Sequence, residues 1–217
     1  MSHMSNVTYS QKMSLQPGGA QEGKPEDFAT TSDEMRLRYL LEKSTWAETV
    51  TWTDVDAVGN ALMSGEICPC PSLLTARLGE ALDVPLMDYI SAWFKYWHGG
   101  IRMKFQLSIA APMTGRLFFA YHYGAISDPP NLTEMLGQYA QIIMIDASKT
   151  EFEVVIPYRA INNRSRVPSG ATTYNTSIGR WYLGVMTPLK TMSTTANIVY
   201  INRYVSAAPD FELEYYG

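Results

Sequence analysis

The side chains best suited to catalysis or metal binding are scarce in this chain, and histidine is the scarcest. The three histidines are His3, His98 and His122. A metal-dependent oxygenase or a cupin needs at least two histidines and a carboxylate that converge on one ion. Neither His98 nor His122 belongs to a His-x-His or His-x-Asp pair. Each is therefore expected to have a surface or hydrogen-bonded structural role, and acid loosening of packing at His98 is the less favoured hypothesis.

The two cysteines, Cys68 and Cys70, stand in the short sequence C-P-C. This spacing is too tight for a zinc knuckle, and no histidine lies nearby in the sequence to complete four ligands. A redox pair usually has two intervening residues. We therefore interpret the segment as a packed or solvent-facing turn.

Other patterns that carry chemistry are equally weak. The chain contains no G-x-S-x-G sequence and no phosphate-binding G-K-[ST] loop. Asp83 and Asp88 fit a helix cap and a solvated helix face. Trp93, Phe94 and Trp97 could stack on nucleic-acid bases, but their helical spacing favours a core or a subunit contact. We expect no catalytic, cofactor-binding or metal-binding residues.

Composition points toward a protein that makes contacts. Aromatic residues make up 12% of the 217 residues, whereas charged residues make up only 18%. Such a balance is typical either of an interaction surface or of an aromatic-rich β core. The formal net charge of −4, without any Lys/Arg tract, argues against a protein whose main task is to grip phosphates.

No apolar run approaches the roughly 20 residues that a membrane-spanning helix needs, and the N-terminus lacks a signal-peptide core. We therefore expect no membrane insertion, and a cytosolic location is the default.

Two short helices are predicted. Thr31-Ser32-Asp33-Glu34 has the spacing of a capping box, so a helix should follow and run to about Lys43. A second helix is predicted from Pro85 to Trp97, between a proline and the pair Gly99-Gly100. A further helical turn fits 132–137.

The remaining elements are predicted strands. Residues 101–109 alternate strictly between apolar and polar side chains, which indicates one buried and one wetter face. Residues 117–121 are apolar on both faces, so this strand should be covered on both sides, and 139–146 share that character. The other predicted strands are 46–55 with a continuation at 61–67, 152–156, 180–187, 196–206 and 211–215.

Variable loops and the absence of a strand-helix-strand rhythm favour an all-β fold, an eight-stranded antiparallel jelly-roll sandwich with two short helices and an extended N-terminal arm. The arm should cover residues 1–31 and the jelly-roll domain residues 32–217. One sandwich core is predicted to contain Ile101, Phe105, Leu107, Leu117, Phe119, Ile143, Val154, Leu183 and Ile198.

Several segments resemble those of one family of viral proteins. Residues 94–100 (FKYWHGG) resemble the segment F-x-Y-W-R-G-S that opens a central strand in these proteins. Further matches are 114–117 (TGRL), 156–158 (IPY), 205–213 (VSAAPDFEL) and the helix and strand region 35–53. Because they occur in order over most of the chain, the sequence resembles the capsid proteins of picornavirus-like positive-strand RNA viruses, order Picornavirales.

Two residues depart from the family pattern. His98 stands where arginine is common, and Pro209 replaces the first acid of the D-D-F pattern, which leaves only Asp210. Some relatives use that pattern in cleaving a capsid precursor, so we do not assign this chemistry to Asp210. The N-terminal segment is most similar to that of the third large capsid protein, whose arm gathers beneath the fivefold axis.

The resemblance implies a structural coat protein, not an enzyme, that assembles with related jelly-roll subunits into an icosahedral shell around an RNA genome. It implies other capsid proteins of the same virus as partners, weak non-specific contact with genomic RNA, and a host receptor. The implied location is the virion, with assembly in the host cytoplasm. The alternative is a cellular jelly-roll module that binds carbohydrate or a receptor, for which the chain lacks the usual secretion signal or disulfide framework.

Overall fold

The computed structural model describes residues 36–69, 84–109, 113–124, 132–137, 139–145, 150–168, 176–191 and 198–216. The chain divides into two compact units, Met1–Leu40 and Leu41–Gly217, and all the strands belong to the second. The predicted arm and the capping residues of the first helix lie outside the described residues.

The described helices are α1 (Leu37–Glu42), α3 (Leu86–Ser91) and α4 (Leu132–Leu136). The strands are β1 (Thr45–Thr53), β2 (Ala61–Glu66), β3 (Phe94–His98), β4 (Ile101–Ser108), β5 (Met113–Tyr123), β6 (Tyr139–Ile145), β7 (Glu151–Ile156), β8 (Ser165–Arg166), β9 (Gly179–Thr191), β10 (Ile198–Ala207) and β11 (Glu212–Tyr216).

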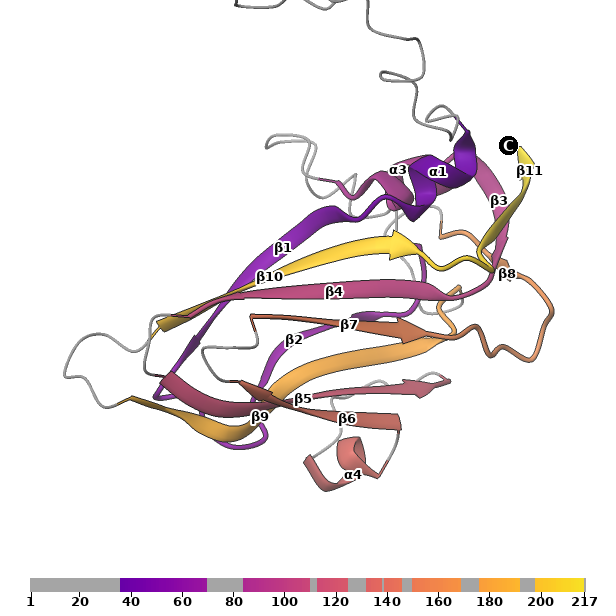
Figure 1. Ribbon diagram of the computed structural model, residues 1–217. Helices are drawn as coiled ribbons and strands as arrows, with labels where there is room; N and C mark the ends of the chain where they lie inside the picture. Colours follow the sequence, from indigo (N-terminus) through magenta and orange to yellow (C-terminus); the bar gives the residue numbers. More distant parts are fainter. Residues whose placement is uncertain are drawn as a thin grey trace, which may run out of the picture. The chain divides into compact units, whose positions relative to one another are not determined.

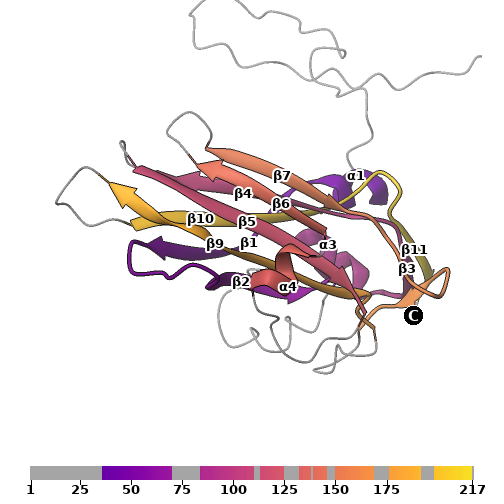
Figure 2. The same ribbon diagram turned by 90° about the horizontal axis from the view of Figure 1, so that it is seen from below.

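Eight of these strands form two four-stranded antiparallel sheets. The first sheet has the order β1-β10-β4-β7 and the second has the order β2-β9-β5-β6 (Figure 1). The two sheets face one another, with β1 and β2 along one side and β6 and β7 along the other (Figure 2). A three-stranded sheet, β11-β3-β8, lies beyond one end. The predicted eight-stranded jelly-roll sandwich is confirmed.

The two apolar strands β4 and β5 follow one another in sequence but do not pair. β4 lies between β10 and β7 in the first sheet, whereas β5 lies between β9 and β6 in the second. The short connection between them therefore crosses from one layer of the sandwich to the other. β4 shows the predicted alternation of buried apolar and more exposed polar side chains.

Aromatic side chains from both sheets form the centre of the core. The ring of Phe105 on β4 lies 4.8 Å from that of Phe152 and 5.7 Å from that of Phe119, measured between centroids. Phe119 in turn stacks on Trp181 at 5.9 Å. Each such buried side chain contributes roughly 1.5–3 kcal/mol by leaving water, and aromatic pairs add about 0.5–1.5 kcal/mol.

The predicted core is confirmed except at one position. Ile101, Phe105, Leu107, Leu117, Phe119, Ile143, Val154 and Leu183 are all buried. Ile198 is 38% exposed, so its assignment to the core was wrong. Ile201 pairs with Leu107 of β4 and both face inward, which fixes the phase of β10 so that Val199 and Ile201 point into the core and Ile198 points away.

The predicted helix from Pro85 to Trp97 is only half right. A helix begins after Pro85 and ends at Ser91, but Phe94–His98 is strand β3. Trp97 is fully buried in the three-stranded sheet, where its ring lies 5.2 Å from Tyr158 and 6.0 Å from Phe211. Pairing of β3 with β11 and β8 outweighs the local helical pattern.

The glycine pair before β4 is required by close backbone contact. Gly99 has φ of +104°, and a Cβ there would collide with the backbone of Asp210 and Phe211. The Gly100 N–H donates a hydrogen bond to Oδ1 of Asp210 at 3.1 Å. The turn after β10 is thereby fixed against the start of β4, which positions β11 beside β3.

Helix α4 explains why β5 is apolar on both faces. Phe118 and Ala120 point away from the sandwich core, yet they are 0% and 1% exposed. They pack with Met135 of α4 and with Tyr182 of β9. The predicted covering of β5 on both sides is confirmed, and α4 supplies part of the cover.

Candidate functional site

The structure does not bring His98 and His122 together. His98 lies on β3 in the small sheet, where its ring packs against Tyr158 at 4.6 Å, and His122 lies on β5 in the second sheet. His3 is outside the described residues. Among the residues that the structure describes, no group of three or more His, Cys, Asp or Glu side chains could hold a metal ion.

His122 is the most unusual of the candidate side chains. It is 2% exposed, and neither ring nitrogen has a hydrogen-bond partner. Its ring stacks on Tyr182 at 5.8 Å, and Arg180 is its neighbour across the β5–β9 pairing. Burial lowers the pKa of His122, a contact with the backbone of Tyr123 opposes this, and the charge of Arg180 adds to it. A neutral, structural histidine fits these surroundings.

The remaining candidates are also structural or lie outside the described residues. Asp88 is buried in the first turn of α3, so its assignment to a solvated helix face was wrong. Cys68 is buried and disulfide-bonded, a bond that the sequence did not predict. Cys70, the only other cysteine, and Asp83 lie outside the described residues. No helix within the described ranges is long and apolar enough to cross a membrane.

The fold separates Trp93 from Trp97, two of the residues considered as a base-stacking platform. Trp97 is buried, whereas Trp93 is 45% exposed and packs edge-on against Tyr89 at 5.2 Å. Asp210, the remaining acid of the D-D-F pattern, accepts the hydrogen bond from Gly100. Its observed contact is therefore structural.

One charged pair inside the sandwich was missed by sequence reasoning. Arg203 faces inward from β10, with Cζ 4.9 Å from the ring of Trp181 and Nε 2.8 Å from Oε1 of Glu48 on β1. The alternation of β10 would have placed Arg203 on the same face as Ile201, but only the pairing with β1 shows that Glu48 lies opposite. The pair neutralises two charges at the end of the core.

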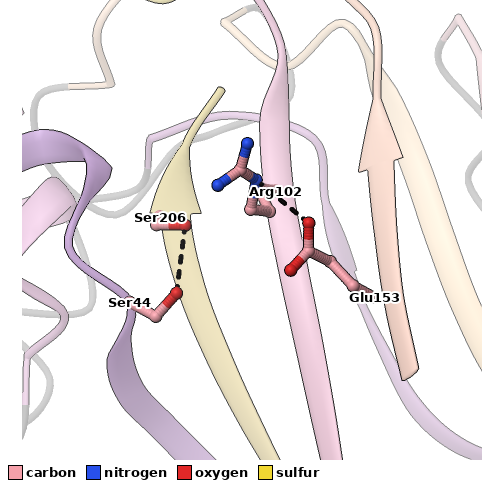
Figure 3. Close-up of polar contacts among 4 residues, drawn as sticks. All are labelled: Ser44, Arg102, Glu153 and Ser206. Carbon is pink, nitrogen blue, oxygen red and sulfur yellow. Dashed lines mark hydrogen bonds and ion pairs between the residues drawn. The ribbon is translucent and has the colours of Figure 1, made fainter. Parts of the chain in front are cut away.

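The outer face of the first sheet carries ion pairs between its own strands. Arg102 of β4 lies 3.2 Å from a carboxylate oxygen of Glu153 on β7, as Figure 3 shows, and Lys104 lies 2.8 Å from Glu151. On β10, the buried Ser206 accepts a hydrogen bond from Ser44 at 3.3 Å (Figure 3). The same face also exposes Val155, Ile198 and Tyr200, at 44%, 38% and 50%.

The second sheet is different at its β6 edge. Ile142 and Met144 point outward and are 54% and 60% exposed, and Tyr139 is 47% exposed. Of the four strands that end the two large sheets, β1, β2 and β7 each contain at least one glutamate, whereas β6 (YAQIIMI) contains no charged residue, proline or glycine. Exposed apolar edge strands without such protection readily pair with another chain. The β6 edge is therefore the candidate contact surface.

The gap between β6 and β7 is closed at one end by polar and aromatic contacts. The hydroxyl of Tyr123 donates to the carbonyl of Pro157 at 2.7 Å, and Arg159 donates to the Tyr139 hydroxyl at 2.6 Å. Tyr139 stacks on Tyr121 at 5.2 Å. Burial, followed by the neighbouring Tyr121, raises the pKa of Tyr123 to about 12, so its hydroxyl stays a donor at neutral pH.

Beside these contacts a groove of about 300 Å³ runs between the two edge strands. Its walls include Phe119, Tyr121, Tyr139 and Gln141 from the second sheet and Glu153 and Val154 from β7. The groove and the apolar β6 edge are continuous, because Tyr139 and Gln141 belong to both. We refer to them together as the β6 edge and its groove.

Comparison with known sequences finds viral polyproteins. The chain is 23% identical over 197 residues to the genome polyprotein of Salivirus A and 22% identical over the same length to that of human klassevirus 1. Each match covers 90% of this chain but only 8% of the polyprotein. No protein-family profile matches the sequence.

Comparison with solved structures finds virus particles. The Triatoma virus empty capsid matches with a TM-score of 0.71 and 19% identity over 98% of this chain and 87% of that one. Rhinovirus-B5 gives a TM-score of 0.72 and 18% identity over 99% and 91% of the two chains, and black queen cell virus gives 0.69 and 22% over 99% and 86%. The chain therefore has the jelly-roll fold found in these viral structures.

Proposed function

We propose that this chain is a structural capsid protein of an icosahedral, picorna-like virus of the order Picornavirales. Its role is mechanical, and it acts as one subunit of the virion shell. The observation that carries this proposal is a capsid-type jelly roll whose second sheet ends in an uncharged, exposed apolar edge at β6. The ordered sequence motifs and the similarity to viral genome polyproteins support it independently.

The finer assignment is to the third large capsid protein, with related jelly-roll subunits as partners. It rests on the N-terminal segment and on the order of motifs in the sequence. In this proposal residues 1–31 act as an arm that meets its symmetry mates, residues 32–217 form the tile, and contact with RNA is weak and non-specific. Assembly takes place in the host cytoplasm.

The β6 edge is proposed to pair with an extended segment of a neighbouring subunit. An edge strand offers a row of backbone donors and acceptors, and a partner strand satisfies them while covering Ile142 and Met144. The outer face of the first sheet instead carries ion pairs between β4 and β7. Free energy for association then comes from apolar area, at roughly 25 cal/mol per Å² before the costs of association.

The test is assembly of the chain when it is expressed with the other capsid subunits of the same genome. Ile142→Lys places a charge on the β6 edge without touching the core, so we expect normal melting of the isolated chain and a loss of closed shells in sedimentation and electron microscopy. The matched control is Ile161→Lys, the same change at a fully exposed loop position. Normal shells from Ile142→Lys would refute the proposed edge contact.

The arm is tested by deleting residues 1–30. These residues contain few apolar groups and no helical or strand periodicity, so ordering them costs about 1–2 kcal/mol per residue that only contact with other subunits repays. We expect the melting temperature to change little and shell formation to fall sharply. Unchanged assembly would refute the arm's role, and a truncated chain that no longer folds would place these residues in the core.

A further inference from the structure

The side chains around His122 form a polar row that the proposed function leaves unused. We propose that this row, which consists of His122, Arg180 and Glu66, is an acid-sensitive contact that holds helix α4 on the second sheet. Protonation of His122 releases α4, while the two-sheet sandwich stays folded. The proposal concerns the chain as a folded domain and goes beyond its role as a capsid subunit. It is narrower than a general loss of stability in acid, because one element opens before the rest.

Three strands contribute to the polar row. His122 of β5 is the register partner of Arg180 on β9, and Arg180 is also the register partner of Glu66 on β2. Side chains at intervals of two along a strand share a face, so His122 lies on the same outer face as Phe118 and Ala120. Direct cross-strand neighbours have Cβ atoms about 4.5–5.5 Å apart. A carboxylate, a guanidinium and an imidazole are therefore adjacent across the sheet.

The polar atoms of the row are poorly satisfied. Within the described part of the chain, neither ring nitrogen of His122 has a hydrogen-bond partner, and the same holds for the buried atoms Nε of Arg180 and Oε2 of Glu66. Buried polar groups in folded proteins are nearly always hydrogen-bonded. Because the row lacks such bonds, its present arrangement depends on the packing around it, and another arrangement of the same groups can satisfy more of them.

Packing connects the row to α4. The ring of His122 stacks on that of Tyr182 at 5.8 Å, with 27° between the two planes. Tyr182 in turn packs in one buried cluster with Met135 of α4, which is 3% exposed. Figure 1 shows α4 on the side of the second sheet that faces away from the first. Helix α4 has only five residues, too few to be stable without tertiary contacts, so it depends on side chains such as Tyr182.

A proton on His122 is unfavourable in this arrangement. Burial lowers the pKa of His122, and the charge of Arg180 lowers it further. Tyr182 supplies no compensating charge, since burial raises the pKa of its hydroxyl, an effect that Arg180 opposes. The carboxylate of the row, Glu66, lies beyond Arg180, and the acid of α4, Glu134, is exposed. Among these groups, the protonated ring therefore has a like charge beside it and no carboxylate next to it.

The response to acid is expected in the side chains. Strands β5 and β9 pair on both sides of His122, so the backbone is fixed and the side chains move. The charged ring repels Arg180, which turns toward the carboxylate of Glu66. The ring then leaves Tyr182 for water, and α4 loses the packed surface beneath Met135.

The sign and size of the pH dependence follow from proton linkage. In the released form the imidazole has an ordinary pKa of about 6.5, whereas in the closed form the pKa of His122 is lowered. The contact is therefore complete above about pH 6.5. Below that pH, the ratio of the released to the closed form rises by up to about tenfold per pH unit, as far as the lowered pKa.

The first experiment follows methionine oxidation in the wild-type chain, so it needs no substitution. Limited peroxide converts an accessible thioether to the sulfoxide, and mass spectrometry gives the rate for each methionine at about pH 7 and about pH 5. Met135 reports the release of α4, Met103 (2% exposed) reports unfolding of the sandwich, and Met144 (60% exposed) reports the intrinsic rate. Relative to Met144, we expect oxidation of Met135 to be at least about fivefold faster at the lower pH, with Met103 unchanged. A smaller rise at Met135, or a parallel rise at Met103, overturns the inference.

The second experiment assigns the release to His122. His122→Gln keeps a polar side chain that takes up no proton in this pH range, so the rise at Met135 should fall below about twofold. His98→Gln is the matched control on β3 and should keep the wild-type rise. Arg180→Gln removes the like charge and should leave a smaller rise than the wild type. A rise of about twofold or more in His122→Gln, loss of the rise in His98→Gln, or an unchanged rise in Arg180→Gln overturns the inference.

Discussion

The outer faces of the two sheets differ in how their side chains are paired or covered. On the first sheet, Arg102 and Lys104 pair with glutamates of β7, so the polar groups of that face satisfy one another. On the second sheet, Phe118 is fully buried beneath its neighbours, yet Ile142 and Met144, one strand further out, are more than half exposed. The first face carries ion pairs between its strands, and the second is covered by a helix only near α4.

The difference shows where a subunit of this fold is complete by itself and where it needs a neighbour. Surface ion pairs contribute little stability but keep a face soluble and free of other chains. An apolar edge has the opposite effect, because its cover must come from elsewhere. Substitutions on the two faces should therefore separate folding from assembly, with the largest effects on folding in the core between them.

The largest loss of stability is expected for Phe105→Ala. Phe105 is fully buried between Phe119, Phe152 and Trp181, so its removal leaves a cavity in both layers and should cost roughly 3–5 kcal/mol in the free energy of unfolding. The contrast is Ile142→Ala at the β6 edge, which should stay within about 0.5 kcal/mol. Equilibrium denaturation of both chains gives the values, and equal losses would contradict the distinction between core and edge.

The second-largest loss of stability is expected where Gly99, just before β4, contacts the backbone of Asp210. Gly99→Ala forces a non-glycine residue to φ of +104° and drives its Cβ into the backbone of Asp210. Strain of this kind costs about 1–3 kcal/mol before the collision is counted. Gly124→Ala is the matched control, since Gly124 has φ of +101° but nothing within 4 Å of its Cβ position. Thermal melts should show Gly99→Ala as clearly the worse of the two, and equal melting temperatures would refute the close contact.

His122, which is buried on β5 of the second sheet, should make the free energy of unfolding fall in acid. Its pKa in the folded chain is lowered by burial, so below about pH 6.5 the unfolded chain binds a proton that the folded chain does not. Stability that is complete above that pH is therefore lost as pH falls through it, with a slope of at most about 1.4 kcal/mol per pH unit from this one group.

His122→Gln should flatten the decline of melting temperature between about pH 7 and pH 5. His98→Gln controls for the removal of one histidine from the chain. If His98→Gln flattens the curve as much as His122→Gln does, the argument from burial of His122 is wrong.

The smallest loss of stability is expected on the outer face of the first sheet. Glu153→Gln removes the ion pair with Arg102, whose side chains are 47% and 29% exposed, and should cost at most about 1 kcal/mol, with less difference at high salt. Denaturation at low and high salt measures both. A loss of several kcal/mol would mean that this face is a buried network and would remove the contrast between the two faces.

The sequence determined the features that depend on local pattern. The alternation of β4, the covering of β5 on both sides and the helical turn at 132–137 could all be predicted, because each depends on a pattern within a short stretch of neighbouring residues. The glycine pair before β4 was predicted to end a helix, whereas it follows strand β3. The eight-stranded sandwich followed from these strands and from the resemblance to capsid proteins.

The tertiary structure decided what depends on pairing between distant segments. Trp97 lies in a strand because β11 and β8 pair with β3 on either side. Ile198 points outward because the register with β4 sets the phase of β10. Glu48 of β1 lies beside Arg203 of β10 and forms an ion pair with it. The position of β6 at an edge beside β7 is of the same kind. An apolar strand has the same sequence pattern in the centre and at the edge of a sheet. Its place is set by pairing with strands that are distant in the chain.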